Sequence, residues 1–423
     1  MHDSIRITRR DVLAGAAATA LYGIAPRGSV AAPEPVPVKS VAAIVTAYEH
    51  GLHADVLCGK LMEGWKQDGG PGPALKLVSM YVEQFTDRDM ARPMSAKHNV
   101  PLFDTIEGAV TVGGDSIPVD GVIVIGEHGD YPHNEKGQHL YPRKRFIAGV
   151  ADAFEKYGKV VPVFHDKHLG PEWPDALWIY ERMQQLNVPF MAGSSLAVTY
   201  RTPEIDVPLG SDITAAVGIG YSGLDIYGFH ALEAFQSLVE RRRGAETGVK
   251  SVQCLQGDAM WKVLDDGTVS RELFDAAFGL VSRASANPRR SNDPETALFL
   301  FEYVDGFQGA VFQLPTIAEG SAVALQINGQ NAPLATRFEE RLQPRHPHFA
   351  YLLKGIERMI HTGKPSYPVE RTLLNAGILD RALTSRFEGQ RRLETPELAI
   401  AYTPANYPHA PLPPLDSDPR EPI

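Results

Sequence analysis

The sequence predicts an α/β protein, with an N-terminal Rossmann-like, doubly wound parallel sheet followed by a C-terminal α+β domain with an open mixed or antiparallel sheet. Two short runs rich in Val and Ile, at 121–125 and 159–164, flank a segment with apolar residues at helical spacing, which is the pattern of a parallel β-α-β unit. After Thr214 the pattern changes to strand-like runs separated by turns, with two helical stretches among them.

The composition is that of an ordinary globular protein. The chain has 423 residues, of which 43% are apolar and 22% charged, and this length favours two domains. The net charge of -10 is spread along the chain without a basic stripe, so nucleic acid is not expected as a partner. Cys58 and Cys254 lie in apolar contexts far apart in sequence, and we expect buried free thiols rather than a disulfide.

Residues 1–32 are typical of a bacterial twin-arginine export signal. Arg9 and Arg10 precede the weakly apolar run AGAAATALYGIA, and small residues follow where a signal peptidase could cut. The run is too short and too rich in Ala to anchor the protein permanently in a membrane. We therefore expect a periplasmic or other extracytoplasmic protein, with residues 33–40 as the linker to the first domain.

The predicted nucleotide-binding domain covers 41–203 and opens with a strand at 41–46, a loop and a helix. This is the position of a dinucleotide-binding turn, yet the spacing G-x-G-x-x-G is absent and only Gly51 remains. His50 and His53 are placed to assist a phosphate at the N-terminus of the helix.

The second predicted strand, 75–82, is followed by an acidic residue, Glu83. An acidic residue at this position commonly holds a ribose hydroxyl, and Arg88 lies close behind it. The alternative for Glu83 is a solvated loop carboxylate. Further helices are predicted at 90–100 and 175–186, as a doubly wound domain requires.

Ionisable side chains cluster at the ends of the two central strands. The residues are Glu127, His128 and Asp130 after the first strand, and His165, Asp166, Lys167 and His168 after the second. Because the carboxyl ends of neighbouring parallel strands line the ligand crevice, we expect both clusters to face one cleft.

The second domain is predicted over 204–400, with a Pro-rich tail at 401–423. Its strand-like runs are 215–223, 248–257, 296–314 and 320–329, and its helical stretches are 230–240, 271–281 and much of 345–390. Several neighbouring strands with a covering helix indicate a sheet with helices on one face.

In its motifs the chain resembles the glucose-fructose oxidoreductase and inositol dehydrogenase family. The matching pieces are V-D-G-V-x-I at 119–125, Asp166-Lys167-His168 at the place of the family's E-K-P, the run 194–203, Gly228-Phe229-His230 at the start of a helix, and the closing pattern at 360–382. The resemblance implies an α/β domain over the substrate site, to which the 345–390 helices return. It also implies a homo-oligomer formed through the open face of the second sheet.

The resemblance implies roles for individual residues as well. Lys167 matches the Lys that lies against nicotinamide and substrate, and His230 the His that exchanges the substrate hydroxyl proton. Asp225 corresponds to its acidic partner at a spacing one residue longer than the pattern, and Arg201 and Tyr227 are candidates for binding the substrate. The expected cofactor is NAD or NADP, and its candidate ligands are His50, His53, Glu83, Arg88, Glu127 and His128. A core histidine and a lysine packed at a strand end are the alternatives for His230 and Lys167.

Three departures from the family pattern are clear. The glycine fingerprint is missing, His168 replaces a Pro, and the polar loop 126–132 stands where the family has a short loop over the nicotinamide. A carboxylate in this loop disfavours a nearby pyrophosphate. A divalent cation such as zinc, manganese or iron is therefore an alternative to a hydrogen-bonded network, with ligands from His128, Asp130, His133, His165 and His168.

Three functions remain open at this point. The first is an exported NAD(P)-dependent oxidoreductase that acts on a sugar, cyclitol or related polyol. The second is non-redox carbohydrate chemistry by a lyase, hydratase or glycosidase-like enzyme with Glu127 and His128 at its centre, with or without a metal. The third is a non-catalytic sugar-binding or scaffold protein, against which the many ionisable groups at the strand ends argue.

Overall fold

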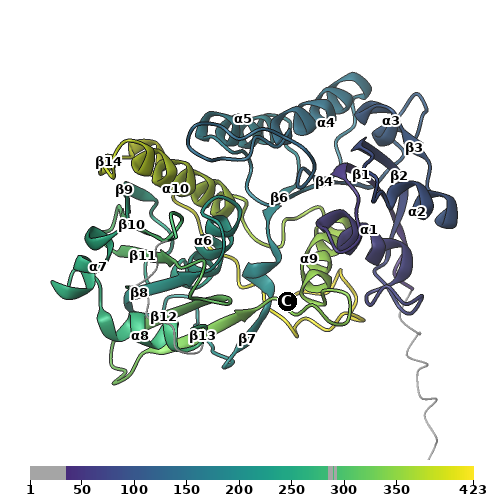
Figure 1. Cartoon of the computed structure of the whole chain (residues 1–423). Helices are drawn as coiled ribbons and strands as arrows, with labels where there is room; N and C mark the ends of the chain where they lie inside the picture. Colours follow the sequence, from purple (N-terminus) through teal and green to yellow (C-terminus); the bar gives the residue numbers. More distant parts are fainter. Residues whose placement is uncertain (1–34, 284–288, 290–292) are drawn as a thin grey trace, which may run out of the picture. The chain divides into compact units, whose positions relative to one another are not determined.

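The computed structural model describes residues 35–283, 289 and 293–423. Within it, Pro37–Ile423 form one compact unit (Figure 1). The predicted export signal at 1–32 lies outside the described residues. No helix in the described ranges is long and apolar enough to span a membrane.

The first sheet is parallel and has the strand order β3-β2-β1-β4-β5-β6. Its strands are β1 Lys39–Ala47, β2 Leu75–Gln84, β3 Leu102–Phe103, β4 Gly121–Ile125, β5 Val163–Asp166 and β6 Phe190–Gly193. The chain changes direction of winding between β1 and β4, which is the switch point where open α/β sheets bind ligands. This confirms the predicted Rossmann-like sheet.

Helices cover both faces of this sheet, because successive side chains of its strands point to opposite faces. Ile44 and Val124 lie in one apolar cluster, whereas Val45 and Ile125 lie in the other. One face is covered by α3 Ile106–Thr111, α4 Arg143–Tyr157 and α5 Trp173–Gln185, and the other by α1 His53–Glu63, α2 Ala91–His98 and α9 His348–Thr362 (Figure 1). Burial on both faces explains why these strands are continuously apolar in sequence.

The second sheet is mixed, as predicted, with the strand order β14-β9-β10-β11-β8-β12-β13-β7. Its strands are β7 Tyr200–Thr202, β8 Ile213–Gly220, β9 Val249–Leu255, β10 Ala297–Tyr303, β11 Gln308–Gln313, β12 Ser321–Ile327, β13 Leu334–Glu339 and β14 Leu393–Glu394. Strands β8 and β11 pair in parallel, and β7 joins this sheet through antiparallel pairing with β13. The predicted domain boundaries at 203/204 and 400/401 stay predictions.

Helices cover both faces of the second sheet, and the expectation of helices on one face only was wrong. On one face lie α6 Ile226–Val239 and α10 Glu370–Phe387; on the other lie α7 Asp258–Asp265 and α8 Arg271–Gly279. Helix α7 has only about two turns, too few for a clear helical period, but it buries Met260 and Leu264 against the strand residue Phe312.

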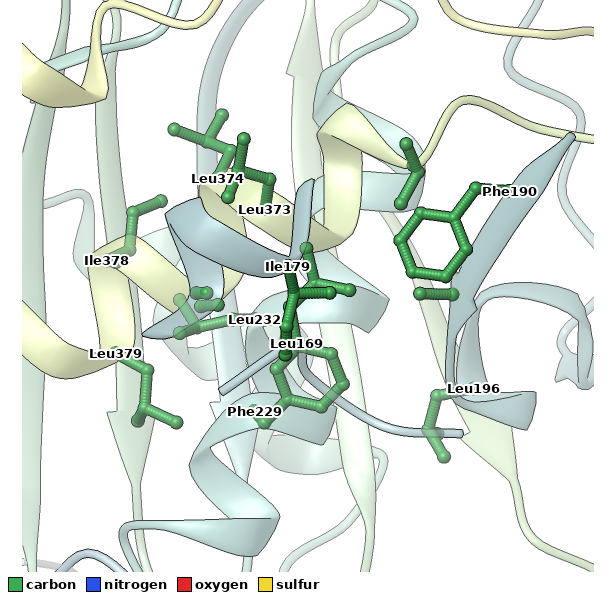
Figure 2. Close-up of a cluster of buried hydrophobic side chains, with 14 of the residues drawn as sticks. Leu169, Ile179, Phe190, Leu196, Phe229, Leu232, Leu373, Leu374, Ile378 and Leu379 are labelled. Atoms are coloured by element: carbon green, nitrogen blue, oxygen red, sulfur yellow. The ribbon is translucent and has the colours of Figure 1, made fainter. Parts of the chain in front are cut away.

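The apolar core continues from α5 and β6 to α6 and α10. Figure 2 shows Ile179 and Phe190 in the same cluster as Phe229 and Leu373. This packing fixes α6 at the carboxyl end of the first sheet. Both cysteines are buried and free, as expected from the sequence.

Candidate active site

A cavity of about 440 Å³ lies at the carboxyl ends of β1, β4 and β5. Residues that line it include Gly51 and His53 after β1, Glu127 and His128 after β4, Lys167 after β5, and Tyr227 and His230 on α6. Three side chains expected to share one cleft, those of Glu127, Lys167 and His230, therefore lie around a single cavity at the switch point of the sheet.

The Lys167 side chain meets His230 inside this cavity. Lys167 has a φ of 71°, in the left-handed region that residues other than glycine rarely adopt, and its backbone N–H donates to the Gly193 carbonyl at 3.0 Å. Its ammonium group donates a hydrogen bond to Nε2 of His230. His128 also has a positive φ, of 68°. Such strained residues cluster at functional sites.

A chain of hydrogen bonds leads from His230 into the protein. Its Nδ1–H donates to Oγ of Ser194 at 3.0 Å, and this hydroxyl donates to Oε2 of Glu233 at 2.6 Å. The same oxygen accepts the backbone N–H of Ser194 at 2.7 Å. The tautomer of His230 follows from this pattern, because Nε2 is the acceptor for Lys167.

Burial shifts the pKa values of His230 and Glu233, the two ends of this series of hydrogen bonds. Burial, together with the positive charge of Lys167, lowers the pKa of His230 well below its ordinary value, so the imidazole is neutral near pH 7. Burial raises the pKa of Glu233 to about 7. The sequence reasoning missed Glu233, although its position three residues after His230 places it one helical turn further on the same face.

Glu127 is a fixed anion beside the cavity. Its Oε2 accepts a hydrogen bond from Arg143 at 2.6 Å, and both side chains are buried. Burial opposes ionisation, but the positive charges of Arg143 and Lys167 outweigh it and hold the pKa of Glu127 well below its usual range. Arg143 also donates to Nε2 of His168 at 3.0 Å, and Nδ1 of His168 donates to the Gly170 carbonyl at 2.7 Å. Arg143 was not singled out in the sequence.

His53 and His128 form the part of the cavity wall next to the turn after β1. Nδ1 of His53 lies 2.6 Å from Oδ2 of Asp166, and the His53 and His128 rings meet edge to face at 5.3 Å. Burial and the neighbouring His53 lower the pKa of His128 to about 4. Nε2 of His128 has no hydrogen-bond partner among the described residues.

The alternative of a divalent cation is not supported. Within residues 35–283, 289 and 293–423, no three His, Cys, Asp or Glu side chains are arranged to hold a metal ion. His168 is held by Arg143, and the His133 ring stacks on His139 with centroids 4.1 Å apart. Burial lowers the pKa of His165 to about 3. These imidazoles lie in separate surroundings, and His168 alone of these three is held by hydrogen bonds, to Arg143 and the Gly170 carbonyl, whereas neither ring nitrogen of His165 has a hydrogen-bond partner among the described residues.

The loops that follow β1 and β2 are bonded to each other. Glu49, in the loop after β1, accepts a hydrogen bond from Thr86 at 2.8 Å and forms an ion pair with Arg88 at 2.7 Å. The Met90 N–H donates to the Tyr48 carbonyl at 2.8 Å. These contacts close the end of the crevice next to β2.

The predicted ribose ligand is also engaged within the protein. Glu83 accepts hydrogen bonds from Tyr131 at 2.6 Å and from Arg145 at 2.7 Å. The loop that carries Tyr131 crosses the end of β2, where the Asp130 N–H donates to the Gln84 side chain at 2.8 Å. Glu83 is therefore not a solvated loop carboxylate, and its hydrogen-bonding capacity is largely used.

The N-terminus of α1 faces a carboxylate of its own helix. The Gly51 N–H donates to Oδ2 of Asp55 at 2.8 Å. His50 is largely exposed, 3.4 Å from Asp55 and 3.2 Å from Arg345. Of the two predicted phosphate contacts, His50 and His53, only His53 lines the cavity, and it contacts Asp166 rather than Asp55.

The remaining predicted residues lie in different surroundings. Tyr227 lines the cavity, and its ring is 5.7 Å from that of His230. Asp225 accepts the His139 N–H at 2.9 Å rather than a hydrogen bond from His230, and burial raises its pKa to about 6. Arg201 lines a second cavity. The functional roles of all these residues stay predictions.

This arrangement of two sheets is the fold of the dehydrogenase class that includes the inositol dehydrogenases. GenD2 from gentamicin A biosynthesis, in complex with NAD, has a TM-score of 0.55 and 14% identity over 88% of this chain and 99% of its own. Apo scyllo-inositol dehydrogenase from Lactobacillus casei has a TM-score of 0.53 and 13% identity, covering 85% of this chain and 98% of its own.

The WlbA dehydrogenase from Bordetella pertussis, in complex with NADH and UDP-GlcNAcA, has a TM-score of 0.51 at 11% identity, over 86% of this chain and 99% of its own. No protein-family model matches the sequence, and the search of curated proteins finds no match. At these identities the likeness establishes the fold, so the resemblance seen in the sequence is confirmed at that level. The chemistry has to be argued from the cavity.

Proposed function

We propose that this protein is an NAD(P)-dependent oxidoreductase that acts on a sugar, a cyclitol or a related polyol. The observation that carries the proposal is the contact of Lys167 with His230 in a cavity at the switch point of the first sheet. Solved structures with this fold include a scyllo-inositol dehydrogenase and the WlbA dehydrogenase bound to NADH and UDP-GlcNAcA, which supports the substrate class.

The residues around the cavity fit the nicotinamide half of the cofactor. Gly51, His53 and His128 would hold it against the ends of β1 and β4, next to Lys167. When bound, the nicotinamide supplies the hydride acceptor. The adenosine half does not fit the closed loops, so binding a whole dinucleotide requires the contacts of Glu49 with Thr86 and Arg88 to open.

The chain's own residues provide the proton chemistry. A substrate hydroxyl that displaces the Lys167 ammonium from Nε2 of His230 can transfer its proton to this nitrogen, because the imidazole is neutral. The Nδ1 proton can then pass to Ser194 as the Ser194 proton passes to Glu233. Glu233 stores this proton well because its pKa is raised to about 7. The Lys167 ammonium stabilises the developing alkoxide.

Nucleotide binding tests the proposal directly. Isothermal titration with NAD(H) and NADP(H) should give a saturable signal. Glu49→Gln should bind tighter than the unchanged protein, because it removes the charged partner of Arg88 and leaves the cavity intact. The matched control is Glu302→Gln, which changes a glutamate of β10 whose side chain is 30% exposed and pairs with Arg392, and it should leave binding unchanged. Absence of binding in both the unchanged protein and Glu49→Gln would sink the redox proposal.

Glu233 should set the pH dependence of the reaction. Because the carboxylate must be ionised to accept the relayed proton, kcat/KM should rise as the pH rises through about 7. A raised pKa in the folded state contributes stability that is full below the ordinary value of 4.5 and is lost as the pH rises through about 7. Glu233→Gln should remove both dependences. An unchanged pH profile of kcat/KM in this variant would exclude the relay.

Non-redox carbohydrate chemistry is the second candidate, favoured by the closed adenosine end of the crevice. A lyase or hydratase needs proton transfer but no dinucleotide, and His230 with Glu233 could supply it. Glu127, which is held ionised by Arg143, would stabilise positive charge rather than donate a proton. Turnover of a sugar or cyclitol by nucleotide-free protein, with no change in absorbance at the nicotinamide wavelength, would identify this activity.

We further propose export by the twin-arginine route to an extracytoplasmic compartment and assembly into a homo-oligomer. Export rests on residues 1–32 alone. Helices α7 and α8 occupy part of the sheet face expected to mediate assembly, so contacts there would include these helices. Replacing Arg9 and Arg10 with Lys in a reporter fusion and locating the fusion in the cell tests export. Native mass spectrometry, which reports the number of subunits, tests assembly.

A further inference from the structure

The cavity of the candidate active site has a second pair of ionisable side chains, which takes no part in the proton relay of His230. His53 is the first residue of α1 and lines the cavity, whereas Asp166 is the last residue of β5. Nδ1 of His53 lies 2.6 Å from Oδ2 of Asp166, and the two side chains are 14% and 0% exposed. The protein thus covers the carboxylate completely, and only the imidazole reaches the cavity.

The hydrogen bonding of this pair orients the His53 ring. Within the described residues, the Asp166 side chain bonds only to His53, because its Oδ1 has no partner. A buried carboxylate requires a proton donor, so Nδ1 of His53 carries a proton. Nε2 is then the acceptor of the neutral imidazole, and it makes no hydrogen bond in the described part of the chain. A carboxylate that orients an imidazole and stabilises its protonated form is typical of an acid-base group.

Two consecutive residues at the end of β5 therefore serve two different imidazoles. Asp166 pairs with His53, whereas Lys167, whose φ is 71°, meets His230. Both imidazoles line the same cavity, one from α1 beside the first sheet and the other from α6 beside the second sheet. A molecule bound in this cavity can therefore meet two proton-transfer groups that come from different elements.

Two such groups exceed what the oxidation of a hydroxyl requires. That reaction involves one proton transfer, which His230 provides. A second base is needed when a proton also leaves carbon, as in the enolisation of a carbonyl compound. One group then takes the proton from carbon, and a positive charge stabilises the oxygen on which negative charge develops. The Lys167 ammonium beside His230 is placed to supply this charge.

We propose that the cavity has a further activity, in which His53 moves a proton between neighbouring carbons of an α-hydroxy ketone such as a ketose or an oxidised cyclitol. Nε2 of His53 takes the proton from the hydroxyl-bearing carbon, and the electrons of this C–H bond form the double bond of an enediolate. The negative oxygen meets the Lys167 ammonium. The proton of the other hydroxyl passes to this oxygen through His230, and His53 returns its proton to the former carbonyl carbon. The carbonyl group has then moved by one carbon, and no oxidant or reductant is consumed.

Proton exchange with solvent tests this activity in the full chain without nucleotide, because His53 would contact a bound nicotinamide. The probes are dihydroxyacetone, D-fructose and 2-keto-myo-inositol in D2O, followed by NMR. At least one should lose the proton next to its carbonyl group faster than in buffer. His53→Gln should lower this rate by about 100- to 10,000-fold, the range of a lost acid-base group. The matched control is His98→Gln, which removes an imidazole that pairs with Glu63 at 3.2 Å on the surface of α2 and should leave the rate unchanged.

Chemical rescue separates this role from a structural one. Added imidazole should restore part of the exchange in His53→Ala, because the free base can occupy the vacated space. Asp166→Asn removes the charge that stabilises the His53 imidazolium and should lower kcat more than KM.

Three results would overturn the proposal. The first is no exchange above the buffer rate with any of the three ketones, and the second is equal exchange by His53→Gln and the unchanged protein. The third is a marked fall in the Tm of His53→Gln without rescue of His53→Ala by imidazole, which would assign the pair to the fold. Since no step uses a nucleotide, nucleotide binding without exchange would end this proposal and leave the redox function standing.

Discussion

Lys167→Met should lower kcat/KM for the polyol substrate by about 100- to 10,000-fold, the range of a lost acid-base group. Methionine keeps the length and the apolar stem of lysine but removes the ammonium that bonds His230. The lost group stabilises charge that develops on the substrate oxygen, so the effect should fall on kcat more than on KM.

A second readout separates this role from a structural one. Because the charge of Lys167 contributes to the lowered pKa of His230, that pKa should rise in Lys167→Met, as measured by NMR of the imidazole. The matched control is Lys144→Met, which removes an exposed lysine that pairs with Asp175 on α5. It should leave both readouts unchanged. If Lys167→Met retained more than a third of kcat/KM, the assignment of the site would be wrong.

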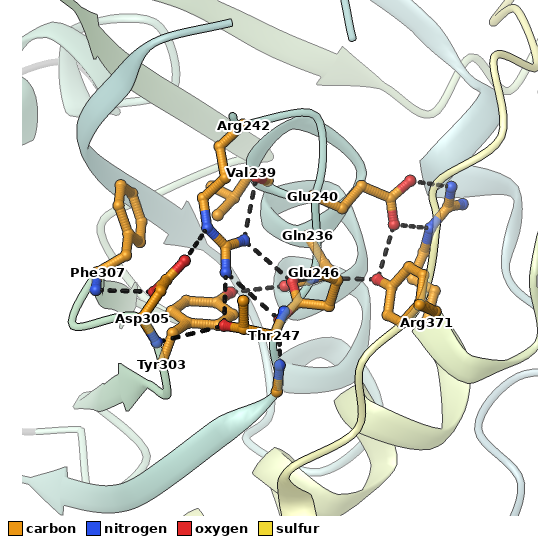
Figure 3. A network of polar contacts seen from close by, with 12 residues as sticks. Gln236, Val239, Glu240, Arg242, Glu246, Thr247, Tyr303, Asp305, Phe307 and Arg371 are labelled. Carbon is orange, nitrogen blue, oxygen red and sulfur yellow. Dashed lines mark hydrogen bonds and ion pairs between the residues drawn. The ribbon is translucent and has the colours of Figure 1, made fainter. Parts of the chain in front are cut away.

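Arg242→Ala should lower the free energy of unfolding by about 3 to 5 kcal/mol, the cost of leaving a buried charge without its partner. Figure 3 shows Arg242 between Asp305 and Glu246, just beyond the C-terminal end of α6. Its guanidinium lies 2.9 Å from Asp305 and 3.1 Å from Glu246, and the Arg242 and Glu246 side chains are 3% and 0% exposed. It also lies 4.4 Å from the centre of the Tyr303 ring, so the substitution removes packing as well.

Thermal unfolding of matched variants checks this expectation. Arg392→Ala breaks an exposed pair with Glu302 and should change the stability by less than about 0.5 kcal/mol. The double variant Arg242→Met with Glu246→Gln removes both charges and should recover part of the loss, because no ion is left unpaired. A Tm of Arg242→Ala equal to that of Arg392→Ala would contradict the prediction.

Much of the candidate site could be anticipated from local sequence. The runs at 121–125 and 159–164 marked neighbouring strands, and chain order then placed Glu127 and Lys167 at one edge of the sheet. Family resemblance added His230. Arg143, Ser194 and Glu233, which lie behind the cavity residues Glu127 and His230, went unrecognised, because each matters through a partner 16 to 39 residues away in sequence. Hydrogen-bond partners at such separations leave no periodic signal.

The sequence by itself determined most of the strands and the longer helices, and which strand ends carry ionisable groups, because burial and turn chemistry are properties of neighbouring residues. Only the tertiary structure decided which charges meet. It paired Glu127 with Arg143, joined Arg88 to Glu49 in the loops next to β2, and placed Arg201 at the second cavity because β7 joins the second sheet. Electrostatic and hydrogen-bond energies depend on distances through space, and these are set when the whole chain packs.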